Sequence, residues 1–174
     1  MLKVGKVTTI ENNNMYIPDI LAVDLGTTTG IAIYAKNKIR SYSKSFKPSR
    51  FESSDIRFVN FNKHLHEIQE LDKIEKVYYE EVRKHIGVDA AHCYGGFKSV
   101  LTAFCITNNI PYEGVSVGTI KKFITGKGNA SKKLVIKAVR EMGHDPSDDN
   151  EADALAIAYY AKDQAIRTLP QILR

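Results

Sequence analysis

Three acidic residues, each next to a run of apolar residues, are the first candidates for chemistry in this sequence. Asp24 ends the apolar run 20–23, Glu80 follows the short run 76–79, and Asp153 lies among small apolar residues. A carboxylate at the end of a buried element is unfavourable unless a cation or hydrogen bonds compensate it. Three such carboxylates brought together would repel one another strongly and would require a counter-ion.

Some of these acids also have explanations that involve no chemistry. Asp24 could cap the glycine- and threonine-rich turn that follows it. Glu80 and Glu81 could both be solvated, although only one of them can face Asp24, because side chains alternate along a strand. At the start of the last helix, Asp148 can be the cap and Glu151 can complete a capping box.

Several converging carboxylates indicate a site for hard divalent cations. Carboxylate oxygens, completed by water and a substrate phosphate, suit Mg²⁺ or Mn²⁺. Two such ions about 3.5–4 Å apart can activate water and stabilise the leaving oxygen of a phosphodiester. Asp149 and Asn150 lie four and three residues before Asp153, so either can share its helix face. No cysteine or histidine pattern indicates a competing zinc site.

A basic segment comes just before the last acidic one. Residues 121–140 contain no acid, and their basic residues are Lys121, Lys122, Lys127, Lys132, Lys133, Lys137 and Arg140. The helix expected over Ser131–Met142 has a core face made of Val135, Ala138, Val139 and Met142. Lys133, Lys137 and Arg140 then line its outer face. Lysines beside a glycine loop are well placed to bind phosphates, and a merely solvated basic helix is the alternative.

Length and composition fit one globular domain. The chain has 174 residues, of which 43% are hydrophobic and 26% charged. We expect an N-terminal extension over residues 1–18 and a single domain over residues 19–174. The net charge of +5 permits a nucleic-acid partner. Two cysteines, no apolar run near the roughly 18 residues of a membrane span and no signal-peptide core predict a cytoplasmic protein.

The elements that would position the acids alternate between strands and helices. Strands are expected at Ile20–Val23, Ile31–Ala35, Ile39–Ser43, Lys76–Tyr79 and Tyr112–Val117. Helices are expected at Phe51–Leu71, Asp89–Asn108, Ser131–Met142 and from Asp148 to about Ile166, with Thr119–Thr125 as a further short element. This order predicts an α/β fold with a mixed sheet. Strand ends at one sheet edge would bring Asp24 and Glu80 together.

The apolar patterns of the first two helices predict what each helix buries. In the first, Ile56, Val59, Leu65, Ile68 and Leu71 recur at helical spacing. In the second, the apolar stripe is Cys93, Phe97, Val100, Leu101 and Phe104, and Gly95 and Gly96 permit a close approach. If part of this stripe faces solvent, the second helix is a candidate homodimer interface, with core packing alone as the alternative.

Four segments in this order resemble the RuvC family of Holliday-junction resolvases, within the ribonuclease H-like superfamily. They are Ala22–Gly26, Tyr79–Val82, Thr119–Lys132 and Asn150–Ala158, and the resemblance covers about Ile20 to Ala161. It implies a five-stranded mixed sheet flanked by helices and a homodimer. It also implies a metal-dependent endodeoxyribonuclease that resolves four-way DNA junctions by paired phosphodiester hydrolysis. The implied cofactor is Mg²⁺, replaceable by Mn²⁺, with two ions per site.

The resemblance also assigns roles to single residues. It places the metal-binding catalytic carboxylates at Asp24, Glu80 and Asp153, and active-site and DNA-contacting lysines at Lys121 and Lys132. The basic residues predicted to contact DNA are Arg83, Lys121, Lys122, Lys127, Lys132, Lys133 and Lys137.

Two positions depart from the family pattern. Asn150 stands where the family usually carries an acid, sometimes a histidine. The side-chain carbonyl oxygen of Asn150 can bind a metal but brings no charge. Asp149, one residue earlier, could supply the missing carboxylate. Arg83 stands where bacterial members often have an aromatic residue that stacks at the junction centre. A guanidinium can also stack on bases and bind phosphates. These departures, with a Lys-, Asn- and Ile-rich composition, resemble a phage-type branch of the family.

Three other functions are consistent with parts of the sequence. A general branched-DNA or flap endonuclease of the same fold would use the same carboxylates. A non-catalytic DNA-binding module would use only the basic residues and would leave Asp153 unexplained. The segment Val23–Gly30 is similar to the first phosphate loop of the actin and sugar-kinase superfamily, but those ATP-binding proteins need two such domains, and 174 residues are too few for both.

Overall fold

The computed structural model describes residues 16–83 and 87–168 of the chain. Within them, one mixed five-stranded sheet has the strand order β3-β2-β1-β4-β5. The strands are β1 Ile20–Asp24, β2 Thr28–Ala35, β3 Lys38–Ser45, β4 Lys76–Glu81 and β5 Tyr112–Ser116. The helices are α1 Ile56–Asp72, α2 Val88–Thr107, α3 Val117–Thr125, α4 Lys132–Glu141 and α5 Asp149–Arg167. The expected α/β fold with a mixed sheet is confirmed, while most of the expected N-terminal extension lies outside the described residues.

The register of the central strands places the ends of β1 and β4 side by side. β1 is antiparallel to β2, and Asp24 pairs with Gly30, which in turn pairs with Ser43 of β3. β1 is parallel to β4, and Val23 pairs with Tyr79. The carboxyl ends of β1, β4 and β5 therefore lie at one edge of the sheet, together with the start of β2. We call this the carboxyl edge.

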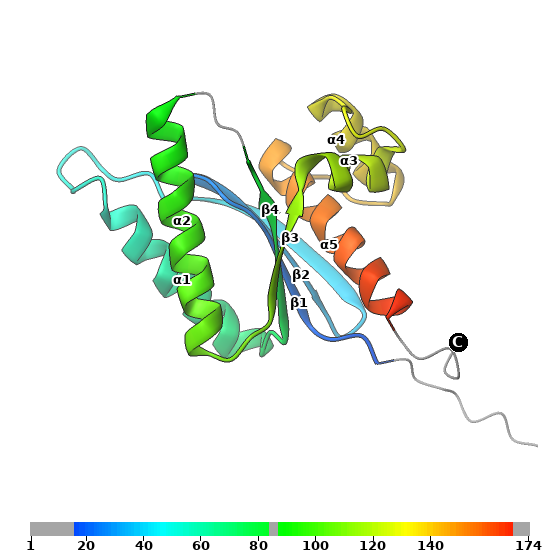
Figure 1. Cartoon of the computed structure of the whole chain (residues 1–174), viewed down its shortest axis with the longest axis horizontal. Helices are drawn as coiled ribbons and strands as arrows, with labels where there is room; N and C mark the ends of the chain where they lie inside the picture. Colours follow the sequence, from blue (N-terminus) through cyan, green and yellow to red (C-terminus); the bar gives the residue numbers. More distant parts are fainter. Residues whose placement is uncertain (1–15, 84–86, 169–174) are drawn as a thin grey trace, which may run out of the picture.

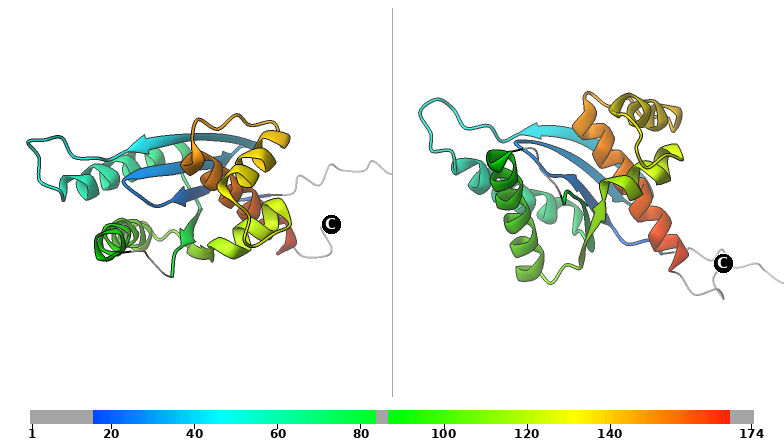
Figure 2. Two further views of the ribbon diagram at one scale, coloured as in Figure 1. Left: turned by 90° about the horizontal axis from the view of Figure 1, so that it is seen from above. Right: turned by 45° about the horizontal axis from the view of Figure 1, so that its top comes forward.

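Helices cover both faces of the sheet. Helices α1 and α2 lie on one face, and α3, α4 and α5 lie on the other (Figures 1 and 2). Each face has its own apolar core, one built on Leu21, Val23 and Ile31, the other on Ala22, Ala32 and Tyr34. This division follows from the alternation of side chains along the buried strands. No helix within the described ranges is long and apolar enough to cross a membrane.

Helix α5 lies very close to the sheet because both surfaces carry small residues. Its buried side chains include Ala152, Ala154 and Ala156. At the start of the helix, Gly30 of β2 lies against the backbone, and a methyl group at Gly30 would lie 1.9 Å from the carbonyl oxygen of Asn150. Only glycine permits this approach. The contact fixes the position of the first turns of α5 above the end of β1.

Helix α1 differs from its predicted extent and face. It begins at Ile56 rather than Phe51, because residues 49–52 form a separate turn in which the Glu52 amide donates to the Ser49 carbonyl at 3.2 Å. Its buried residues are Phe61, Leu65 and Ile68. Val59 and Leu71, predicted to be in the core, are 48% and 78% exposed. Val59 precedes Phe61 by two residues, about 200° around a helix, so the two side chains point to opposite sides.

The apolar stripe of α2 is used inside the subunit. Phe97, Leu101 and Phe104 are buried in the core beneath α1, and the rings of Phe61 and Phe97 are 5.2 Å apart. The predicted close approach holds at Gly96, where an added methyl group would lie 2.3 Å from the Phe58 ring. Core packing, the alternative raised by the sequence, therefore accounts for this stripe.

Candidate active site

Three carboxylates from three elements meet at the carboxyl edge. Asp24 ends β1, Glu80 is near the end of β4, and Asp153 begins the second turn of α5. Burial raises the pKa of Asp24 well above its ordinary value, and repulsion from Glu80 and Asp153 raises it further. Burial and Asp153 raise the pKa of Glu80 to about 7. Burial also raises the pKa of Asp153, against the effect of nearby lysines.

These carboxylates have no direct partners in the described part of the chain. No hydrogen bond or ion pair reaches the side chains of Asp24, Glu80 or Asp153 there. Asp24 therefore does not cap the turn that follows it, contrary to the alternative raised by the sequence. The hydroxyl of Thr29 closes that turn instead by donating to the Gly26 carbonyl at 2.6 Å. Partly buried acids without donors are the arrangement that a cation would stabilise.

The two adjacent glutamates of β4 point to opposite faces, as strand alternation predicts. Glu81 accepts a hydrogen bond from the Lys98 ammonium at 2.7 Å on the α2 side. Glu80 instead lies on the side of Asp153. The hydroxyl of Tyr94 holds the strand end between them, donating to the Glu80 carbonyl at 2.9 Å and accepting from the Val82 amide at 3.1 Å. Sequence reasoning did not identify Tyr94, which belongs to an otherwise ordinary apolar helix.

The start of α5 is held by two serines of β3. Asp148 caps the helix as predicted, accepting from the Glu151 amide at 2.8 Å, and its carboxylate also accepts from Ser43 at 2.5 Å. Glu151 does not complete a capping box. Its carboxylate accepts from the Ser147 amide and hydroxyl, at 2.8 and 2.7 Å, and from Ser41 at 2.7 Å. These donors direct it toward β3 and lower its pKa, although burial alone would raise it.

The two candidates for the fourth ligand lie in different environments. Asp149 forms an ion pair with Lys132, which lowers the pKa of Asp149 and raises that of Lys132. The charge of Asp149 also acts on Asp24 and Asp153, so it lies near both. Asn150 contributes its backbone to the contact with Gly30. Lys132 thus pairs with Asp149 and also acts electrostatically on the three acids.

The donor chemistry of this edge fits a hard divalent cation. Within residues 16–83 and 87–168, no three histidine, cysteine, aspartate or glutamate side chains are close enough to form a complete metal site. Their carboxylate oxygens are the ligand type that Mg²⁺ and Mn²⁺ prefer.

The predicted basic residues divide into two groups. Lys121 of α3 and Lys132 of α4 act electrostatically on Glu80 and Asp153, so both face the acids. The others are exposed residues farther out: Arg83 after β4, Lys122 of α3, Lys127 in the following loop, and Lys133, Lys137 and Arg140 of α4.

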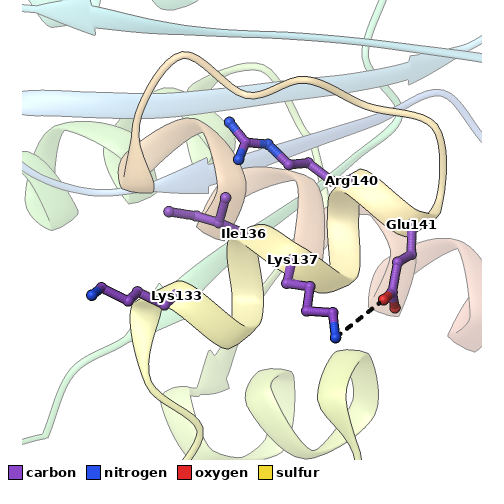
Figure 3. Close-up of a pocket in the computed structure, with 5 residues that line it drawn as sticks. All are labelled: Lys133, Ile136, Lys137, Arg140 and Glu141. Atoms are coloured by element: carbon purple, nitrogen blue, oxygen red, sulfur yellow. Dashed lines mark ion pairs between the residues drawn. The ribbon is translucent and has the colours of Figure 1, made fainter.

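The outer face of α4 is basic, as expected. Lys133, Lys137 and Arg140 line a shallow pocket together with Ile136, and Lys137 pairs with Glu141 at 3.7 Å (Figure 3). Met142, predicted to be in the core, is 46% exposed, because the helix ends at Glu141 and Met142 is its C-cap.

One family model matches most of the chain. Residues 20–160 match the family model described as crossover junction endodeoxyribonuclease RuvC. No curated protein matches the chain. Because the match covers well over half of the chain, it supports neither the ATP-binding alternative nor the non-catalytic DNA-binding one.

Solved structures of several resolvases are similar in fold. The structure of T. thermophilus RuvC in complex with Holliday junction substrate has a TM-score of 0.71 and 23% identity, covering 86% of this chain and 98% of that chain. A second Thermus thermophilus RuvC structure has a TM-score of 0.67 and 22% identity, covering 84% and 97%. The yeast mitochondrial Holliday junction resolvase Ydc2 has a TM-score of 0.60 and 12% identity, covering 88% and 82%. The sheet is thus of the ribonuclease H-like type, and the chain belongs to the crossover junction endodeoxyribonuclease RuvC family.

Proposed function

We propose that this protein resolves four-way DNA junctions by metal-dependent, paired hydrolysis of phosphodiester bonds. The observation that supports this most directly is the set of three partly buried carboxylates without donors at the carboxyl edge. Asp24, Glu80 and Asp153 are the metal ligands in this proposal. When bound, two Mg²⁺ ions, or Mn²⁺ in their place, supply an activated water and stabilise the leaving oxygen.

The chain's own residues bind and orient the DNA. Lys121 and Lys132 hold the scissile phosphate beside the carboxylates and offset the negative charge that develops on it. The exposed lysines of α3 and α4 bind phosphates farther along one duplex arm of the junction. These contacts fix the position of the DNA on the protein but do not recognise its base sequence. Arg83, two residues after the end of β4, contacts the DNA strand that crosses the carboxyl edge.

The substrate is tested with a panel of DNA structures. Purified protein is incubated with four-way, three-way, flap and linear duplex DNA, with Mg²⁺ or with EDTA. We expect Mg²⁺-dependent cleavage that is fastest on the four-way junction, with paired nicks in strands of like polarity. Equal cleavage of flaps and four-way junctions would favour the general branched-DNA endonuclease, and no cleavage of any branched DNA would refute the proposed function.

The fourth ligand can be identified by the Mg²⁺ requirement. If Asp149 supplies the missing family carboxylate, Asp149→Ala should raise the Mg²⁺ concentration for half-maximal cleavage by roughly tenfold or more. Asn150→Ala should raise it only mildly, since the amide brings no charge. Cleavage rates over a Mg²⁺ titration measure both. The opposite order would show that Asn150 keeps the family's ligand position and that Asp149 only pairs with Lys132.

We also propose a homodimer, with an interface on the outer face of α2. A two-fold axis would match the symmetry of a four-way junction and provide one site for each cut. The outer face of α2 includes Val88, Gly95, Ser99, Ala103 and Ile106, which carry no charge, together with the exposed His92. Val88 and Ile106 are 68% and 64% exposed, and no heavy atom lies within 4 Å of a methyl group placed on Gly95.

Light scattering should report about twice the chain mass of 19.5 kDa, free or on junction DNA. Gly95→Lys should yield a folded monomer. The new lysine side chain meets no other atoms of its own subunit, but it places a charge in the proposed interface. Leu71→Lys, at an exposed position of α1, is the matched control and should stay dimeric. A wild-type monomer both free and on DNA would contradict the dimer and favour a nuclease that makes single nicks.

We propose a cytoplasmic location for the protein. Cys93 and Cys105 are both free thiols in the structure. Free thiols are typical of reducing compartments, where junction DNA would also be found.

A further inference from the structure

A single aromatic side chain projects from the segment between β3 and α1. Phe51 is 93% exposed, more than any other large apolar side chain in the described residues. One exposed apolar residue is ordinary on a protein surface. Whether the exposed ring of Phe51 has a binding role therefore has to be judged from its surroundings.

The backbone around Phe51 forms a closed turn. The Glu52 amide donates to the Ser49 carbonyl at 3.2 Å, and the Ser49 amide donates to the Glu52 carboxylate at 2.8 Å. Arg50 and Phe51 occupy the two central positions of this turn. The guanidinium carbon of Arg50 lies 6.0 Å from the centre of the Phe51 ring. The turn thus holds a cation and an aromatic ring together, outside the core; we call this pair the Arg50–Phe51 tip.

The segment that carries the tip is attached to the carboxyl edge at both ends. At its start, the amide of the buried Phe46 donates to the Thr27 carbonyl at 2.7 Å, in the turn that follows Asp24. Just beyond its end, the Arg57 guanidinium reaches the Thr27 hydroxyl at 3.4 Å. Phe51 is five residues from Phe46, so it lies at most about 17 Å away along the chain. The segment projects beyond the sheet on the α1 side (Figures 1 and 2).

The surface near the tip is rich in basic residues. Lys44, Lys47 and Lys63 line a hollow between β3 and α1, where Glu67 is the single acid. Arg50 and Arg57 add two positive charges to this segment, against the two acids Glu52 and Asp55. An apolar protein partner would gain nothing from the positive charges around this aromatic ring, whereas a polyanion would be attracted by them.

We propose that the Arg50–Phe51 tip stacks on a nucleobase exposed at the branch point of the DNA. This inference rests on the proposed function and names an additional contact to the same substrate. Aromatic rings stack on bases of any sequence, and arginine adds cation–π and phosphate contacts. In a continuous duplex both faces of each base are covered, whereas bases at a branch lose a neighbour. The tip therefore favours branched over linear DNA.

The contact can be measured without cleavage. In the Asp24→Asn protein, binding is followed with a four-way junction that carries the fluorescent base 2-aminopurine beside the branch point. Binding should raise the fluorescence, because the analogue leaves its base stack. Adding Phe51→Ala should abolish that rise and weaken junction binding roughly 5- to 100-fold. Phe51→Leu, which keeps an apolar side chain without a ring face, should behave like Phe51→Ala, and Phe51→Trp should preserve both signals.

Controls separate this inference from its alternatives. Leu71→Ala removes another exposed apolar side chain, 78% exposed in the last turn of α1, and should change neither signal. The proposal would be overturned if Phe51→Leu kept the full fluorescence rise and the wild-type affinity. It would also be overturned if Phe51→Ala turned the dimer into a monomer, because the ring would then belong to a subunit contact. If the wild-type protein cleaves no branched DNA, the proposed function fails; if it cleaves and Phe51→Leu changes nothing, only the tip is refuted.

Discussion

Asp24→Asn, Glu80→Gln and Asp153→Asn should each reduce junction cleavage by roughly 10³-fold, about 4 kcal/mol in the activation barrier, and leave junction binding intact. In the proposed site, the charges of these residues hold the metal ions, whereas the lysines of α3 and α4 hold the DNA. Removing a negative charge beside a polyanion should if anything tighten binding. Single-turnover cleavage and binding isotherms on the same junction measure the two effects separately.

The same substitutions should stabilise the metal-free protein at alkaline pH. The pKa of Glu80 is about 7 in the folded chain, against an ordinary value of 4.5. Because its folded pKa is raised, ionised Glu80 destabilises the fold, and stability falls as pH rises from about 4.5 through about 7. Glu80→Gln should therefore raise the melting temperature in EDTA at about pH 8, with a smaller difference at about pH 5.

Glu81→Gln is the matched control for these substitutions. It changes the neighbouring residue in the same way, but its carboxylate pairs with Lys98 on the α2 side of the sheet. Losing one partly exposed ion pair should cost at most about 1 kcal/mol, and cleavage should be nearly normal. Full cleavage by any one of the three variants in Mg²⁺ would remove that residue from the proposed site.

Gly30→Ala should disable the enzyme although Gly30 carries no functional group. Its new methyl group would lie 1.9 Å from the Asn150 carbonyl oxygen and 2.4 Å from the carbonyl carbon. Since both atoms belong to the backbone, the start of α5 must move, and Asp153 moves with it. Misplacement by about 1 Å can cost about 10²-fold in rate, and overpacking typically costs about 1–3 kcal/mol of stability. Cleavage at saturating Mg²⁺ and thermal unfolding measure both effects.

Gly118→Ala is the appropriate comparison for Gly30→Ala. The nearest atom to a methyl group at Gly118 is the Gly128 carbonyl oxygen, at an ordinary contact distance of 3.7 Å. Its stability should stay within about 0.5 kcal/mol of wild type. Wild-type stability and activity in Gly30→Ala would mean that the position of α5 against β2 does not determine the site.

The strands and their acids could be predicted because each depends on a local pattern. The apolar run before Asp24 and the short run before Glu80 identify buried strands, and their parallel pairing brings the two acids together. Asp153 is conspicuous because its neighbours are small and apolar. In each case a few adjacent residues contain the signal.

Other parts of the site depend on contacts between residues far apart in sequence. Ser41 and Ser43 hold the start of α5, more than a hundred residues later, with hydroxyl groups that look ordinary in a strand. Tyr94 fixes the end of β4 from within an apolar helix. The need for glycine at position 30 follows from the backbone of Asn150, which no local pattern reveals. The start of α1 was misplaced because the apolar spacing from Ile56 onward does not reveal the separate turn over residues 49–52.

The order of elements along the chain has a consequence for how the enzyme is made. β1, β2 and β3 pair with neighbours in sequence, so they can fold while synthesis continues, whereas α5 is synthesised after all five strands. Until α5 docks, one face of the sheet lacks its cover of small side chains, and the edge carries Asp24 and Glu80 without Asp153. A nascent or prematurely terminated chain thus lacks the third carboxylate. If Asp153 is a metal ligand as proposed, nuclease activity requires that α5 has docked.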